Sequence, residues 1–170
     1  MSDEEMTSPD LFSVAAVGPV GSRLFLLHCR QGSTVLTVKV EKQQVAVLAG
    51  YLGRIVRELG RTEALPEDLD FDESLEPDWV VGTIGVSYDE DTDRIVVIVE
   101  ETTGDDEDED EDEEGRVASI AVTREQAAAF AVRATLLVEA GRPPCPLCGL
   151  PLDPSGHDCP RTNGHRPPVT

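Results

Sequence analysis

The chain has 170 residues and a formal net charge of −20, from 34 acidic and 14 basic residues. This length is typical of one domain with at most a small appendage. Much of the negative charge lies in an uninterrupted acidic run at residues 105–114. Because nucleic-acid affinity comes mainly from Lys and Arg side chains that displace counterions, this composition disfavours nucleic-acid binding.

Hydrophobic residues make up 39% of the chain, enough for one core. No apolar stretch approaches the ~18 residues that a membrane-spanning helix needs. The first ten residues, MSDEEMTSPD, are acidic where a signal peptide would be basic. We therefore expect a cytoplasmic protein without a membrane-spanning segment.

The N-terminal half predicts three strands followed by a helix. Residues 1–11 are polar and are expected to be a disordered lead-in to an α+β domain at 12–142. Short apolar segments at 12–17, 23–29 and 34–40 alternate with turns that contain glycine, which is typical of strands. Apolar residues then recur at three- and four-residue steps over 41–59, which predicts an amphipathic helix ending at Gly60.

The C-terminal half repeats this order after a connecting loop at 61–78. Strands are predicted at 79–88, 94–101 and 116–122, and an acidic loop at 104–115 separates the last two. The acidic loop is either a solvated spacer or a docking arm for a basic partner. A second helix is predicted from Thr123, its N-cap, to Gly141, its C-cap, with Gln126 at the reciprocal capping position.

The two halves, 12–60 and 79–141, resemble each other. VGPVG at 17–21 matches VGTIG at 81–85, and VEKQQVAVLAG at 40–50 matches VTREQAAAFAV at 122–132, which pairs Gln44 with Gln126. The similarity indicates either a duplicated βββα unit or two helix starts that are alike by chance. The predicted fold class is α+β, with two antiparallel sheets or one continuous sheet from two similar βββα units, covered by the helices.

The strongest chemical signal is a zinc knuckle or ribbon-like tail at 143–170. Cys145 and Cys148 form a C-x-x-C pair, and Cys159 follows after a short loop. His157 is the expected fourth ligand, with His165 as the alternative. Cysteines clustered in a reducing compartment are typical metal ligands, although a redox pair and an incidental cluster stay open.

The zinc is expected to be structural. Three sulfurs and one imidazole nitrogen complete the tetrahedron that structural Zn²⁺ prefers, whereas a catalytic zinc keeps one position open. The tail has few apolar residues and would need the metal to fold. Elsewhere, Cys29 is expected to be a small buried hydrophobic residue on a strand, and His28 a histidine satisfied within the core or on a sheet face.

The segments VEKQQVAVLA, VGTIGVSYD and GRPPCPLCGLPLDPSGHDCPRTNGHR resemble the actinobacterial family known as domain of unknown function 3090. The resemblance extends from about residue 12 to 166. It implies an actinobacterial cytoplasmic protein with a metal-binding tail at Cys145, Cys148, His157 and Cys159, and it implies no activity. The long acidic run departs from the family's pattern.

Three functions are compatible with these features. A non-catalytic interaction or adaptor module with a protein partner is favoured, because no nucleophile, base or open-site acid accompanies the zinc ligands. The first alternative is an enzyme or enzyme subunit with its site in the sheet cleft or at the zinc. The second alternative is a nucleic-acid-associated zinc knuckle, which rests on the tail arginines and is opposed by the overall acidity.

Overall fold

The computed structural model describes residues 3–19, 22–60, 62–103, 115–140 and 146–148. Within these ranges the chain forms seven strands and two helices. In chain order they are β1 (Asp3–Met6), β2 (Leu11–Val17), β3 (Leu24–Gln31), β4 (Thr34–Val40), α1 (Lys42–Leu59), β5 (Trp79–Asp89), β6 (Arg94–Glu101), β7 (Val117–Val122) and α2 (Arg124–Glu139).

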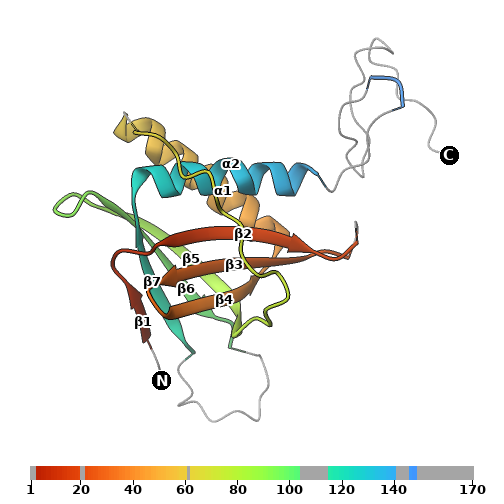
Figure 1. Ribbon diagram of the computed structural model, residues 1–170, viewed down its shortest axis with the longest axis horizontal. Helices are drawn as coiled ribbons and strands as arrows, with labels where there is room; N and C mark the ends of the chain where they lie inside the picture. The colour runs from red at the N-terminus through yellow and green to blue at the C-terminus, as the bar shows by residue number, and fades with distance from the viewer. Residues whose placement is uncertain (1–2, 20–21, 61, 104–114, 141–145, 149–170) are drawn as a thin grey trace.

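The strands form one continuous sheet in the order β1-β7-β6-β5-β4-β3-β2, and both helices lie on the same side of it (Figure 1). The predicted α+β class and the two successive βββα units are confirmed. The sheet is mixed rather than antiparallel, because β4 pairs with β5 in parallel and β7 pairs with β1 in parallel. Within each unit the three strands pair antiparallel, and short turns join β3 to β4 and β5 to β6.

The predicted disordered lead-in at 1–11 is wrong for residues 3–6, which form β1 and complete one edge of the sheet. Met6 is only 2% exposed and belongs to the main core. β1 could not be predicted from the hydrophobic pattern, because DEEM contains one apolar residue and no alternation of apolar and polar residues. Burial of Met6 and pairing with β7 override the weak local preference for a strand.

Both helices begin with a reciprocal capping box, as the pairing of Gln44 with Gln126 suggests. In α1 the boxed residues are Glu41 and Gln44, and in α2 they are Thr123 and Gln126. Each box satisfies backbone N–H groups that the first helical turn leaves without partners. The predicted end of α1 at Gly60 is confirmed by its φ of 90°, whereas the predicted C-cap Gly141 lies outside the described residues.

The other match between the halves, 17–21 with 81–85, is wrong as a structural equivalence. Val17 ends β2, and Gly18, with a φ of 101°, begins the turn that follows. Val81 and Gly85 instead lie inside β5. The two similar sequences therefore form a turn in one half and part of a strand in the other.

A β-bulge at Gly82 keeps the apolar face of β5 turned toward the core. Trp79 and Val81 face inward before the bulge, and Ile84 and Val86 face inward after it, because the register with β6 shifts between Val81 and Thr83. One extra residue reverses the alternation of side chains, and the sequence reverses its apolar pattern at the same point.

The segment between α1 and β5 covers the outer face of the first three-stranded unit. Ser13 Oγ donates a hydrogen bond to the Leu69 carbonyl at 2.5 Å, and the His28 ring stacks on Phe71 with centroids 4.3 Å apart. His28 Nδ1 also lies 2.8 Å from Thr37 Oγ1. The expectation of a satisfied core histidine is confirmed, and Cys29 beside it is fully buried, as predicted.

Gly82→Ala should destabilise the protein by about 1–3 kcal/mol, the usual range for overpacking. A Cβ at residue 82 would lie 2.8 Å from Thr102 Cα, which is backbone and cannot move aside as a side chain could. Gly85→Ala is the matched control in the same strand, since its Cβ would meet nothing within 4 Å. Urea unfolding measures both, and equal stability of the two variants would contradict the bulge argument.

Stability should decline in mild acid through His28. Burial lowers the pKa of this histidine, and the nearby Arg30 charge lowers it further. Because its pKa in the folded state is below the unfolded value, stability is complete above about pH 6.5 and is lost as the pH falls through that value. Free energies of unfolding at about pH 7.5 and about pH 5.5 should differ more in the wild type than in His28→Gln. Equal differences would show that another group carries the pH dependence.

Candidate functional site

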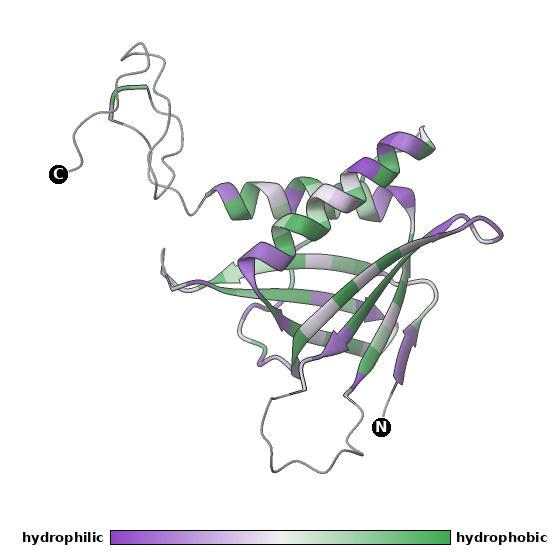
Figure 2. Ribbon diagram, turned by 180° about the vertical axis from the view of Figure 1, so that it is seen from behind, coloured by the Kyte–Doolittle hydropathy of each residue, from purple (hydrophilic) through white to green (hydrophobic). Residues whose placement is uncertain are grey.

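The strongest candidate site is a groove between α1 and β5, with a volume of about 610 Å³. α1 lies along β5 (Figure 2). The wall on the helix side is formed by six residues of α1 and its N-cap: Glu41, Gln43, Gln44, Val47, Leu48 and Tyr51. The strand side is residues 82–86. We call this feature the α1–β5 groove.

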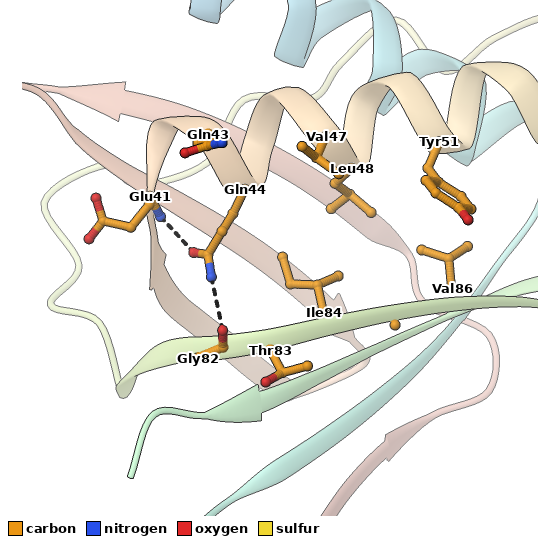
Figure 3. Close-up of a pocket in the computed structure, with 11 residues that line it drawn as sticks. Glu41, Gln43, Gln44, Val47, Leu48, Tyr51, Gly82, Thr83, Ile84 and Val86 are labelled. Carbon is orange, nitrogen blue, oxygen red and sulfur yellow. Dashed lines mark hydrogen bonds between the residues drawn. The ribbon is translucent and has the colours of Figure 1, made fainter. Parts of the chain in front are cut away.

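The groove is lined mainly by apolar side chains, of which Val47 and Tyr51 are open to solvent and Leu48 is buried. Ile84 and Val86 point toward α1 from the strand, opposite Leu48 and Tyr51 (Figure 3). Val47 is 59% exposed and Tyr51 46% exposed, and both border the same groove, so their apolar surface is contiguous. A concave surface of this kind, bordered by a few polar groups, is the usual form of a binding site.

Gln44 closes one end of the groove with a fixed set of hydrogen bonds. Its Oε1 accepts from the Glu41 N–H at 2.8 Å as part of the capping box. Its Nε2 donates to the carbonyl of Gly82 at 3.2 Å and, more weakly, to that of Val81 at 3.4 Å (Figure 3). One side chain thus caps the helix and also ties it to the bulged strand.

The polar groups at the groove have little catalytic potential. The Glu41 carboxylate and the Tyr51 phenol are the ionisable side chains among the lining residues, and neither lies beside a second lining group that could act as its acid–base partner (Figure 3). The Arg54 guanidinium lies 4.6 Å from the centroid of the Tyr51 ring, in a cation–π contact that orients the ring. The arrangement can bind apolar groups and polar backbone, with a carboxylate at one end.

A second, polar hollow surrounds the start of α2, where the charges of Arg124 and Asp93 are paired with each other. Arg124 Nη2 lies 2.9 Å from Asp93 Oδ1 and its Nη1 donates to the Leu59 carbonyl, while Tyr88 Oη donates to Asp93 at 2.6 Å. The Tyr88 hydroxyl and Arg124 together lower the pKa of Asp93. This cluster joins the β5–β6 hairpin to both helices.

The predicted zinc ligands lie almost entirely beyond the described residues. Only Cys148 is described, within a turn at 146–148, whereas Cys145, His157, Cys159 and the alternative His165 are not. Within the described ranges no three His, Cys, Asp or Glu residues are grouped so that they could hold a metal ion. The zinc site therefore stays a prediction from the sequence.

The sequence indicates the groove through extra apolar residues on α1, which helical periodicity alone did not single out. Val47 and Tyr51 are four residues apart on α1, beside the stripe formed by Val45, Leu48 and Leu52. With these two residues, the apolar face of α1 is wider than the stripe that packs against the sheet. The offset between β4 and β5, which pair at only two positions, has no such signal in the sequence.

The fold and groove define a mixed α+β protein with an open groove that is lined mainly by apolar residues. Residues 5–159 match a family model described as a protein of unknown function (DUF3090), and the chain belongs to this family. A search of curated proteins and a search of solved structures both returned no match. Among the described residues, no helix is both long and apolar enough to cross a membrane.

Proposed function

We propose that this protein is a non-catalytic interaction module that binds a protein partner. The observation that carries the proposal is the α1–β5 groove, where Val47 and Tyr51 leave apolar surface exposed above Ile84 and Val86. Burying such surface against a partner is favourable by roughly 25 cal/mol per Å² before the costs of association. A fixed apolar groove is therefore a surface on which a partner can be held.

The chemistry of the lining supports binding over catalysis. Acid–base or nucleophilic catalysis needs a nucleophile or titratable group with a partner that tunes it. The polar side chains of the groove are two glutamines, one threonine, the Tyr51 phenol and the Glu41 carboxylate. The enzyme alternative has no comparable support from the described residues, and the net charge of −20 weighs against a nucleic-acid partner.

We further propose that the tail at 143–170 holds one structural zinc through Cys145, Cys148, His157 and Cys159. The support is the C-x-x-C spacing and the set of nitrogen and sulfur donors within fifteen residues. In this proposal the metal orders a segment that has too few apolar residues to fold alone. The ordered tail would then present a second surface to a partner.

Purified protein should contain one zinc per chain by metal analysis. The double variant Cys145→Ser and Cys148→Ser should contain none, because two of four ligands are lost. His157→Ala should lower occupancy more than His165→Ala. Full occupancy in the double variant would refute the zinc site, and equal effects of the two histidine variants would refute His157 as the fourth ligand.

Binding through the groove can be tested by differential capture. Immobilised wild-type protein and the variants Val47→Asp and Leu136→Asp would each be incubated with a lysate of the source cells. Val47 and Leu136 are both exposed helix positions, at 59% and 62%, so the substitutions should have similar small effects on stability, within about 0.5 kcal/mol. We expect proteins retained by the wild type and Leu136→Asp to be lost from Val47→Asp. Identical retention by all three would contradict a binding role for the groove.

A further inference from the structure

β5 has a free edge that runs along the groove. β5 pairs with β4 only at Trp79 and Val80, and then continues to Asp89 after β4 has ended at Val40 and the chain has turned into α1. Within the described residues no strand pairs this edge beyond Val80. The segment from Trp79 to Asp89 also contains no proline or lysine, the residues with which proteins usually protect an open edge.

The alternation of the ladder shows which backbone groups face this edge. The Glu101 N–H donates to the Arg116 carbonyl on the β7 side, so the neighbouring Glu100 faces β5, where it pairs with Thr83. Every second residue of β5 from Thr83 therefore bonds to β6. The residues between them, Ile84 and Val86, direct their N–H and C=O groups to the free edge and their side chains toward α1.

The other half of the molecule shows the same helix–strand pair in a closed form. The alignment that pairs Gln44 of α1 with Gln126 of α2 makes α2 and β2 the counterpart of α1 and β5. Gln126 Nε2 donates to the Pro9 carbonyl at 2.7 Å, just as Gln44 donates to Gly82. Arg133 Nε then donates to the Val14 carbonyl of β2 at 2.6 Å, which occupies an edge carbonyl that β5 leaves open.

Two residue differences between the aligned helices explain why the α1–β5 groove is open. In the closed half the rings of Phe12 and Phe130 stack with centroids 4.4 Å apart and fill the space between strand and helix. In the same alignment the position of Phe130 is Leu48 in α1, and the position of Arg133 is Tyr51. The shorter side chain leaves the groove unfilled, and the tyrosine leaves the strand edge without the donor that Arg133 supplies.

The negative charge of the chain favours a basic molecule in the α1–β5 groove. The chain carries a net charge of −20, and Glu41 lies at one end of the groove. A second copy would bring the same charge and be repelled, whereas a basic segment would be attracted. The free edge requires an extended backbone, and the apolar lining requires apolar side chains at alternate positions.

We propose that the α1–β5 groove takes an extended peptide of a partner protein, apolar at alternate residues and basic overall, as an added strand on β5. This inference rests on the proposed function and specifies its mode of recognition. The peptide backbone pairs with Ile84 and Val86, and alternate side chains lie against Leu48 and Tyr51. In this mode the backbone bonds provide affinity, and the groove provides selectivity.

The probe is the peptide most enriched when a phage-displayed library of random linear peptides is selected on the wild-type protein. We expect alternating apolar residues and basic residues among the enriched sequences. Methylating the amide nitrogens of every second residue should weaken binding about tenfold or more, while methylating the other set should have little effect, since a docked strand turns alternate amides toward β5. This test uses wild-type protein and does not depend on any variant folding.

The double variant Leu48→Phe and Tyr51→Arg imitates the closed half and should also bind the peptide at least about tenfold more weakly. Val132→Arg, an exposed position on α2, is the control for the added charge. Peptides that bind the double variant and the wild type equally, or that tolerate methylation at both sets of amides, would overturn strand addition. The proposed function would then still be judged by the capture experiment.

Failure to enrich any peptide would overturn the inference as well. Sedimentation of the wild type tests whether a second copy of the chain occupies the groove. A concentration-dependent dimer that the double variant does not form would show that the free edge of β5 pairs with itself. The second copy, rather than a peptide, would then be the occupant. A monomer at all concentrations, with the peptide bound, would support the proposal.

Discussion

The short parallel junction between β4 and β5 determines the rest of the structure. Two residue pairs, Val38 with Trp79 and Lys39 with Val80, join the two halves of the sheet. Because β4 ends immediately afterwards, α1 starts beside β5 and has to run along it, and β5 continues with one edge unpaired. The bulge at Gly82 then turns Ile84 and Val86 toward the helix. The groove is thus a consequence of where one strand stops and its neighbour does not.

The two helices pack differently against the strands beside them. In each half, a capping glutamine reaches from the helix to a backbone carbonyl of the strand beside it, Gly82 for α1 and Pro9 for α2. α2 is then secured by Arg133 and the stacked Phe130, whereas beyond Gln44 the α1 side of the groove is formed by Val47, Leu48 and Tyr51. A fold built from two βββα units therefore has one helix–strand pair in direct contact and one separated by an open groove.

Sequence periodicity was sufficient for elements formed by local patterns and insufficient for long-range pairing. The strands of both units, the capping box of α2 and the glycine that ends α1 follow from alternation, three- to four-residue spacing and turn chemistry. β1 could not be predicted, since its acidic residues form a strand only because β7 offers an edge and the core has room for Met6. The parallel junction, and with it the groove, depends on residues about forty positions apart. The zinc ligands, by contrast, are close in sequence, so short-range spacing alone predicts them.

The proposed zinc tail and the groove should act as energetically separate elements. Among the described residues, the buried members of the main core, from Met6 to Ala134, all belong to the sheet and the two helices. A cooperative core of this kind does not need a metal, whereas a tail with few apolar residues has no other source of folding free energy. Loss of zinc would then remove one recognition surface and leave the groove intact. An acidic chain can thus offer two sites to one partner, and two weak contacts joined in one molecule bind far more tightly than either alone.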